Sequence, residues 1–407
     1  MPTPSSDTAL RQEYVDAAAE LREKFATTAA EVDREATFPH ENMRLIARSP
    51  LHDLSLTRSA GGQASEDMYD DTLTMFHVVK NIAAGDGSTA QVYELTRRKS
   101  VTLTGANSKL GAEARQEVIR RVRDEGALIC SPVAERGARG DYRVPIRKVD
   151  GGVVINGTKY FATGSAGASY ASTIGLMEGF ESVKTGGGHE VLIDLSWDGV
   201  QLNHDWDNMG QRATSSGSIT FNDVFVPDGY HWAGSNAAAS AAPNPVDLAG
   251  IFSQYFTSAV LLGIGLGAMD ALRDYLQTNP TYPGIFEDTS IKYQLGLHQA
   301  RLTAAEAALE IAMQKGLAFR RDPQADQRGA VSIAGIQAKI SAYEATTGFA
   351  AELPKFLGGQ ASSRKYAYDR FWRDARTFAL TDVMEVKVQQ AGAWAMRREA
   401  PPITFAS

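Results

Sequence analysis

The spacing of apolar residues divides the chain into two helical regions separated by a region of strands. In the first region, apolar side chains recur at helical intervals, and Gly and Pro fall in the breaks between segments. Helices are predicted over 7–36, from 38 onward, and over 66–84, 89–100 and 112–124. The segment 86–89 is predicted to break the third helix and to cap the fourth, since Asp86 suits a helix N-terminus.

After Gly126 the pattern changes to short alternating runs that are typical of strands. In the run 218–226, Ile219 and Phe221 fall on one face and polar residues fall on the other. Further strands are predicted over 127–133, from 153, and over 170–177, 190–195 and 200–204. This region therefore predicts a compact antiparallel β domain, either a small barrel or a sandwich.

Helical spacing returns after a linker at 235–245 that is rich in Ala, Ser and Pro. A long apolar helix is predicted over 246–277, and later helices carry buried stripes that include Leu309 and Ile336. The expected fold is α+β and mostly α, with an N-terminal helical bundle, a central β domain and a C-terminal four-helix bundle. The predicted domain bounds are 1–126, 127–234 and 235–407.

Composition narrows the classes of function. The 407 residues are 43% apolar and carry a net charge of −7 without a Lys/Arg run, so neither nucleic acid nor membrane is an expected partner. The single cysteine, Cys130, fits a reducing compartment and is interpreted as a buried residue rather than a catalytic thiol. With no apolar run of roughly 20 residues, a cytoplasmic protein is expected. The seven histidines lack ligand spacing, so no metal site is predicted.

Two polar stretches carry the candidate chemistry. The stretch 156–165 opens with Asn156-Gly157, a pair typical of hairpin turns because both residues tolerate positive φ. Small residues and Thr163 follow, so backbone N–H groups and a hydroxyl can contact a flat polar ligand. The loop 209–217 places Arg212 among Gly and hydroxyl residues, and it is either an ordinary polar loop or the lining of a ligand site.

Two other patterns are interpreted as structural. Gly263, Gly265 and Gly267 imitate part of a dinucleotide fingerprint, but they lie inside a predicted helix, which favours close helix packing. The segment 370–382 places three Arg and two Asp among aromatic residues, which favours a buried electrostatic anchor over a solvated helix face.

In this order, the motifs resemble those of the acyl-CoA dehydrogenase superfamily from about Phe38 to Pro402. The matching segments are Phe38-Pro39, Gly61-Gly62, Asn156-Gly157-x-Lys159-x-x-x-Thr163-Gly164, Met209-Gly210-x-Arg212, Phe221-x-Asp223-Val224-x-Val226-Pro227, Gly358-Gly359 and Arg373-Asp374-Ala375-Arg376. The resemblance implies a homotetramer that binds a flavin between the β domain and the C-terminal bundle. It also implies that segment 160–165 lies against the isoalloxazine ring.

Three segments depart from ordinary acyl-CoA dehydrogenases. Asp382 stands at the position of the commonest catalytic Glu, the Arg-bearing flavin segment is missing at 277–284, and a different loop occupies 131–137. The chain looks more like the branch that contains dibenzothiophene monooxygenase, whose Met-Gly-Gln-Arg-x-Thr-x-Ser-Gly segment matches 209–217. Three histidines of that branch are replaced here, by Gln91, Phe378 and Thr381.

The resemblance to this branch implies a two-component, reduced-flavin-dependent monooxygenase. A separate reductase would supply reduced FMN or FAD, and a flavin C4a-hydroperoxide formed with O2 would oxygenate N, S or activated aromatic C of a small organic substrate. The residues that it implies are Asp382, Thr163 and Gln91 as catalytic; Ser131, Phe161, Thr163, Gly164, Arg212, Ser215 and Ser216 as flavin contacts; and Tyr93, Phe378 and Thr381 as substrate contacts. The alternatives are an acyl-CoA-type dehydrogenase or flavin oxidase with Asp382 as base, and a catalytically inactive assembly subunit.

Overall fold

The N-terminal helices lie where the apolar spacing predicts them. A computed structural model describes residues 9–138, 140–234, 244, 246–278 and 284–403. Its first five α-helices are α1 (Gln12–Glu35), α2 (His40–Ala47), α3 (Thr72–Gly85), α4 (Gly87–Thr104) and α5 (Ala112–Glu125). The Asp86 carboxylate accepts the Thr89 backbone N–H at 2.6 Å and caps α4, as predicted.

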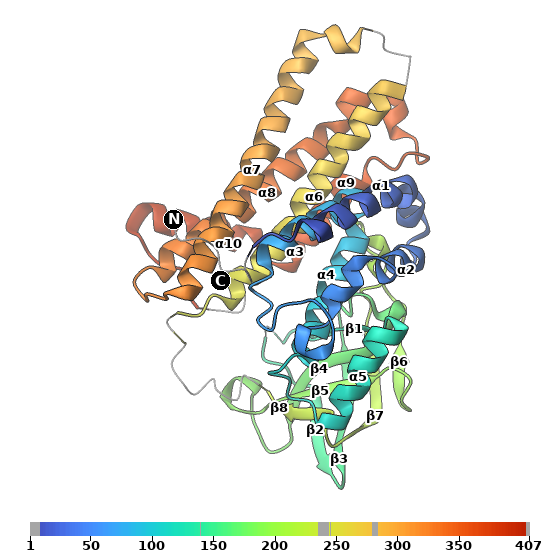
Figure 1. Cartoon of the computed structure of the whole chain (residues 1–407), viewed down its shortest axis with the longest axis vertical. Helices are drawn as coiled ribbons and strands as arrows, with labels where there is room; N and C mark the ends of the chain where they lie inside the picture. The colour runs from blue at the N-terminus through green and yellow to red at the C-terminus, as the bar shows by residue number, and fades with distance from the viewer. Residues whose placement is uncertain (1–8, 139, 235–243, 245, 279–283, 404–407) are drawn as a thin grey trace.

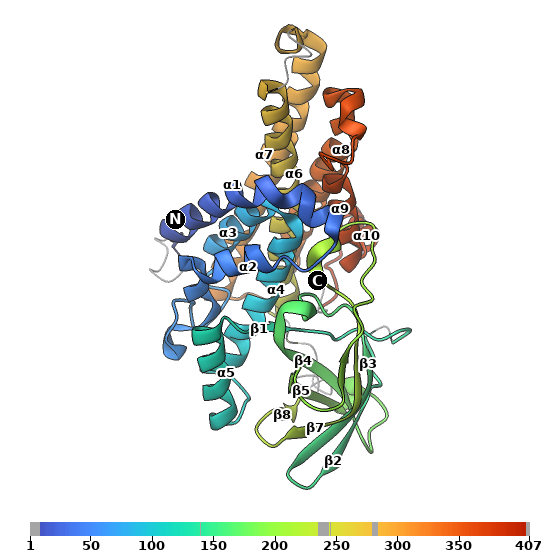
Figure 2. The ribbon, with the colours of Figure 1, turned by 90° about the vertical axis from the view of Figure 1, so that its right-hand side faces the viewer.

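The C-terminal helices form a second group, above the sheet in Figure 1. They are α6 (Ala249–Thr278), α7 (Thr289–Arg321), α8 (Arg328–Leu357), α9 (Arg370–Phe378) and α10 (Met384–Arg397). In both views, α6 and α7 project away from the sheet (Figures 1 and 2). All but one residue of the predicted linker 235–245 lies outside the described residues.

Helix α6 joins the two groups of helices. A Cβ added at Gly263 would lie 2.4 Å from the Lys80 carbonyl oxygen, and one added at Gly267 would lie 2.2 Å from that of Ala84. These glycines therefore allow α6 to approach α3 closely, which confirms the packing interpretation. By length and composition α6 could cross a membrane, but 78% of its most apolar window is buried within the protein, as in a core helix. Helices from both ends of the chain share one apolar core, so the three-domain division remains an interpretation.

The strands form one curled sheet beside the helices (Figure 2). Its order is β6 (Val200–Leu202), β7 (Ile219–Pro227), β3 (Gly152–Lys159), β2 (Pro145–Val149), β4 (Ala168–Met177), β5 (Gly188–Asp194) and β8 (His231–Ala233), with β1 (Leu128–Cys130) paired to β4. The β1–β4 and β2–β4 pairings are parallel, so the sheet is mixed rather than purely antiparallel as predicted. Strands β2 and β8 were not predicted, because only Ile146 among their residues is fully buried and the others show no clear apolar alternation.

The expected hairpin at Asn156-Gly157 is wrong. Both residues lie inside β3, where the register shifts between Ile155 and Gly157 as in a β-bulge, and Gly157 has φ 137°. Pairing with β2 on one side and β7 on the other keeps the chain extended, and this overrides the local turn preference. The Asn156 side chain donates to Asp223 Oδ1 at 2.9 Å across the bulge.

Candidate functional site

The two polar stretches singled out in the sequence lie side by side. Backbone hydrogen bonds join them, from the Ala162 N–H to the Gly217 carbonyl at 2.9 Å and from the Gly164 N–H to the Thr214 carbonyl at 2.8 Å. Segments 160–165 and 211–217 therefore form one unit, between the sheet and the first turns of α4.

A chain of buried hydroxyl groups runs through this unit. Thr163 Oγ1 lies 2.8 Å from Ser216 Oγ, which lies 2.7 Å from Thr214 Oγ1. Gln91 of α4 donates its side-chain N–H to Thr163 Oγ1 at 3.4 Å. We call Gln91, Thr163, Thr214 and Ser216 the hydroxyl cluster. The structure thus brings together three residues that the resemblance assigned to catalysis or flavin binding: Gln91, Thr163 and Ser216.

Two glutamines at this cluster have polar atoms without a partner among the described residues. They are Gln91 Oε1 and both side-chain polar atoms of Gln211, which is 1% exposed. Buried polar groups in native proteins are nearly always hydrogen-bonded, because an unmade bond costs about 1–3 kcal/mol. The cluster therefore has the donors and acceptors of a site that takes a polar ligand.

An exposed aromatic ring stands beside the cluster. Phe161 is 62% exposed and has φ 59°, a strained backbone conformation for a side-chain-bearing residue. Its ring meets that of Trp206 edge-on, with centroids 6.3 Å apart. Trp206 in turn donates its indole N–H to the Gln211 carbonyl at 2.9 Å. A strained and exposed aromatic residue next to unpartnered polar atoms favours contact with a flat ligand.

Helix α9 holds the 209–217 loop in place. Asp374 Oδ1 accepts the Gln211 backbone N–H at 2.6 Å, and Arg373 donates to the Met209 carbonyl at 3.0 Å and to Asp33 of α1. A Cβ at Gly210 would lie 2.1 Å from the Arg373 carbonyl oxygen, so the motif needs glycine there. Burial raises the pKa of Asp374 to about 7. The predicted electrostatic anchor in segment 370–382 is confirmed.

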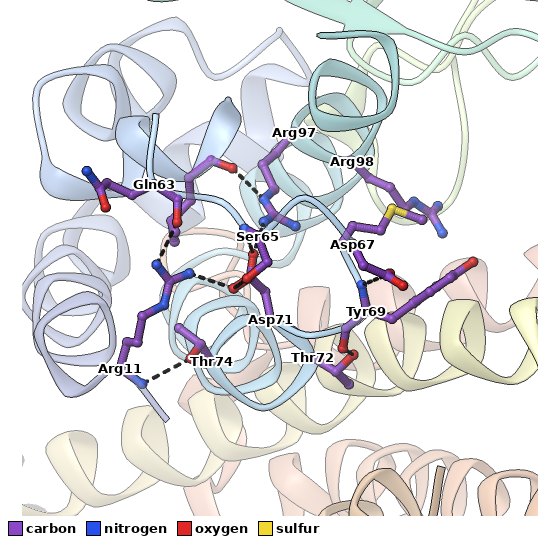
Figure 3. A network of polar contacts seen from close by, with 12 residues as sticks. Arg11, Gln63, Ser65, Asp67, Tyr69, Asp71, Thr72, Thr74, Arg97 and Arg98 are labelled. Carbon is purple, nitrogen blue, oxygen red and sulfur yellow. Dashed lines mark hydrogen bonds and ion pairs between the residues drawn. The ribbon is translucent and has the colours of Figure 1, made fainter. Parts of the chain in front are cut away.

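The face of α4 opposite Gln91 packs against the preceding loops through Tyr93 and Arg97. Tyr93 is 2% exposed and donates its hydroxyl to the Leu51 carbonyl at 3.1 Å. Arg97, one turn further along α4, donates to the Leu54 carbonyl and pairs with Asp71 at 3.3 Å. Figure 3 shows Arg97 and Arg11 converging on Asp71. Tyr93, assigned to the substrate by the resemblance, thus lies away from the hydroxyl cluster.

Asp382 lies in an ion-pair group of its own. Its Oδ2 is 2.9 Å from Lys339 Nζ of α8 and 3.5 Å from Lys387 Nζ of α10, and Lys339 also donates to Gln254 of α6. One carboxylate oxygen of Asp382 is therefore shared by two ammonium groups.

Phe378 and Thr381 were assigned to the substrate and lie just before Asp382. Phe378 is buried, whereas Thr381 is exposed and donates its hydroxyl to the Phe378 carbonyl at 2.8 Å. This hydrogen bond closes the turn that follows α9.

The remaining residues that the resemblance assigned to flavin binding include three that are partly buried, Ser131, Arg212 and Ser215. Ser131 follows β1 in a loop that reaches the site through a backbone bond from the Tyr160 N–H to the Ala134 carbonyl at 2.9 Å. Arg212 begins the short 3₁₀ turn of the 211–217 segment and Ser215 follows it, and the Ser215 carbonyl accepts the Ser165 hydroxyl at 2.9 Å. All of them lie on the two joined segments or on the neighbouring loop.

Two other groups with reactive side chains, Cys130 and the cluster of His77, Glu306 and Glu310, are interpreted as structural. Cys130 is free and 1% exposed, and burial raises the pKa of its thiol to about 12, which supports the structural interpretation. His77, Glu306 and Glu310 have the proximity of metal ligands, but the Lys80 ammonium binds both Glu306 and His77. A cavity of about 510 Å³ between α1, α6 and the start of α9 contains none of the predicted site residues.

Comparisons with known proteins decide the family. A model of the acyl-CoA dehydrogenase C-terminal domain matches residues 255–385. Dibenzothiophene monooxygenase from Rhodococcus qingshengii is 30% identical, over 95% of this chain and 94% of the relative. The chain belongs to the dibenzothiophene monooxygenase family.

Other members and neighbours of this family name its cofactor. The probable FMNH2-dependent monooxygenase SfnC of Pseudomonas putida is 26% identical, over 96% of each chain. The FMN-bound structure of TdsC from Paenibacillus sp. A11-2 is 27% identical, with a TM-score of 0.83 over 97% of this chain and 100% of that one. These relatives confirm the predicted superfamily and the monooxygenase class. Of the two flavins predicted, FMN or FAD, they support FMN.

The residues of the site fit such a cofactor. A flavin presents a flat aromatic ring with polar edges and a phosphate. Here an exposed Phe161 ring, Gln211 and the half-buried Arg212 lie on the joined segments, and Gln91 faces them from α4. Among the described residues, the side chains of Gln91 and Gln211 have polar atoms without a partner.

The sequence interpretation missed Gln211 and Lys339 as site residues. Gln211 stood within the quoted loop motif, but only its burial sets it apart. Lys339 had a signal, because a charged residue between Ile336 and Ile340 interrupts the stripe expected to be buried.

Proposed function

We propose that this protein is a reduced-FMN-dependent monooxygenase that oxygenates a small organic molecule, with sulfur compounds first among its substrates. The observation that carries the proposal is the hydroxyl cluster, which joins the two predicted flavin segments to α4 and includes unpartnered polar atoms. The relative named as an FMNH2-dependent monooxygenase supports the class of reaction, and the dibenzothiophene monooxygenase supports the preference for sulfur.

Each part of the site has a role in this proposal. Bound reduced FMN supplies two electrons, so that one atom of O2 enters the substrate and the other leaves as water. Thr163 and Gln91 would hold a polar edge of the flavin, Phe161 would cover its ring, and Arg212, Ser215 and Ser216 would bind its phosphate. Ser131 approaches from the neighbouring loop. The walls formed by α4 and the 209–217 loop exclude water from the reacting atoms.

Asp382 argues against the dehydrogenase alternative. A dehydrogenase needs a carboxylate that is ready to accept a proton from carbon. Here Lys339 and Lys387 both bind Asp382 Oδ2, so two ammonium groups already engage the oxygen that a base would use. We therefore assign Asp382 to substrate positioning rather than to proton removal.

We also propose a partner, a compartment and an oligomeric state for the enzyme. A separate NAD(P)H-dependent reductase would supply reduced FMN, and the enzyme would act as a cytoplasmic homotetramer. Support comes from the relative named as FMNH2-dependent, from the absence of a dinucleotide fingerprint after a strand, and from the family resemblance.

The test is isotope transfer. The purified protein is mixed with a flavin reductase, NADH, FMN and a panel of sulfides, amines and phenols under ¹⁸O2, and products are analysed by mass spectrometry. The proposal expects one ¹⁸O atom per product molecule, only when FMN is being reduced. A desaturated product without ¹⁸O would instead support the dehydrogenase. Failure to bind reduced or oxidised flavin would support an inactive assembly subunit.

A further inference from the structure

A fully buried lysine stands among the helices near the site. Lys339 is 1% exposed, and its ammonium donates to Gln254 Oε1 and to Asp382 Oδ2, the latter at 2.9 Å. Lys387 lies 3.5 Å from the same Asp382 oxygen. One carboxylate oxygen is therefore shared between two ammonium groups. The ammonium of Lys339 has three N–H donors, and the two named acceptors take two of them.

Helix α6 links this lysine to α4, the helix that carries Gln91 of the hydroxyl cluster. Gly87 of α4 faces Ile264 of α6, and Arg98 of α4 donates to Ser253 of α6 at 3.1 Å, so the two helices run antiparallel. Gln254, which binds Lys339, is thus level with the Arg98 end of α4. Gln91 lies two turns away on the same helix, about 10 Å along the axis.

Burial makes the charge of Lys339 costly. It lowers the pKa of the Lys339 ammonium, and the neighbouring Asp382 carboxylate acts in the opposite direction. A buried charge is stable when it is paired and hydrogen-bonded. An added anion would give Lys339 a partner that it does not share with Lys387.

The approach to Lys339 suits an organic anion. The Asp382 side chain is 17% exposed, compared with 2% for Lys339, so access is past Asp382. On either side of Asp382, Leu380 and Val383 are 62% and 56% exposed. A ligand here meets a cationic centre with apolar surface around its entrance.

We propose that Lys339 binds an anionic group of the substrate, a carboxylate or a sulfur oxyanion, and that Leu380 and Val383 contact its apolar part. Asp382 then orients the Lys339 ammonium and limits how strongly the anion is held. This inference deepens the proposed function by naming the substrate class, and its test needs no flavin, so the two can fail separately.

The test compares two probes of equal shape, benzoate and neutral benzamide, by isothermal titration calorimetry at pH 7. Wild type is expected to bind benzoate at least about tenfold more tightly than benzamide, as charge-assisted hydrogen bonds predict. Lys339→Met should abolish the preference. Lys355→Met is the control, because Lys355 also belongs to α8 but its side chain is 57% exposed. It should behave as wild type.

Asp382→Asn gives an independent result if Lys339→Met does not fold. It removes the competing carboxylate and leaves an amide beside Lys339, so benzoate affinity should rise about threefold or more while benzamide affinity stays the same. Equal binding of the two probes to wild type, an unchanged preference in folded Lys339→Met, or an unchanged or lower benzoate affinity in Asp382→Asn would overturn the proposal.

Discussion

The two faces of α4, one with Tyr93 and Arg97 and the other with Gln91, differ in how completely their polar groups are hydrogen-bonded. On the back face, Tyr93 and Arg97 have their polar groups bound to Leu51, Leu54 and Asp71. On the front face, Gln91 makes one long hydrogen bond to Thr163 and leaves its carbonyl oxygen without a partner among the described residues. Gln91 and Tyr93 are both buried and lie two positions apart. Burial alone therefore does not distinguish the two faces of α4, whereas the hydrogen bonding of their polar atoms does.

The back face of α4 also fixes the position of Gln91 on the front face. A helix that presents an incompletely bonded residue to a ligand needs its other side fixed. Asp71 provides this, because it binds Arg11, Arg97 and both the N–H and the hydroxyl of Ser65 in one place (Figure 3). The back face thus holds α4 so that Gln91 faces the two joined segments, 160–165 and 211–217.

The largest effect is expected from breaking the back face. Asp71→Ala leaves Arg97 buried without its counter-charge, so the free energy of unfolding should fall by about 3–5 kcal/mol, measured by urea denaturation. Asp67→Ala is the control, because Asp67 lies on the same loop as Asp71. Its ion pair with Arg320 of α7 is more exposed and should contribute less than about 1 kcal/mol. Equal losses in the two variants would contradict the structural role of Asp71.

A change on the front face should show the reverse pattern. Gln91→Leu removes a polar group that is incompletely bonded, so stability should change by less than about 0.5 kcal/mol. Reduced-FMN-dependent product formation should fall about 10–100-fold, the value of a lost hydrogen bond to a polar ligand. A variant that is strongly destabilised but fully active per folded molecule would place Gln91 with the structural residues.

The loop that closes the front face should respond to pH. Burial raises the pKa of Asp374 from 3.8 to about 7, so the folded state holds this proton more tightly than the unfolded state does. Its contribution to stability is complete below about pH 4 and is lost as pH rises through 7, with a slope of at most about 1.4 kcal/mol per pH unit.

Asp374→Asn keeps an acceptor for the Gln211 N–H but cannot titrate. Its free energy of unfolding should therefore fall less between pH 4 and 7 than that of wild type. The measurement is urea denaturation at each pH unit, and parallel curves for the two proteins would be the contrary result.

The smallest effect is expected at Tyr93. Tyr93→Phe removes one hydrogen bond, to the Leu51 carbonyl, and should cost about 1 kcal/mol of stability. Steady-state product formation should keep the wild-type kcat and KM. A tenfold change in KM for the organic substrate would instead support a contact between Tyr93 and the substrate.

Local patterns predicted much of this molecule. The helices follow from apolar spacing. The resemblance assigned flavin contacts to both segment 160–165 and loop 209–217, and the structure joins these segments by backbone hydrogen bonds. The hairpin at Asn156-Gly157 was wrong because strand pairing on both sides outweighed the preference of two residues.

Other features depend on long-range contacts. Tyr93 lies on the opposite side of α4 from Gln91, since two positions correspond to about 200° around a helix, and its role as a substrate contact stays a prediction. Lys339 depends on Gln254 and Asp382, contacts of 85 and 43 residues in separation that no local pattern contains.

The most direct measurement is the affinity for reduced FMN in Thr163→Val, with Tyr93→Phe as its control. Valine keeps the shape of Thr163 but removes the hydroxyl that joins Gln91 to Ser216. Anaerobic titration followed by absorbance should give a Kd at least about tenfold higher than wild type for Thr163→Val and an unchanged Kd for Tyr93→Phe. Wild-type affinity in folded Thr163→Val would show that the flavin does not bind at the hydroxyl cluster.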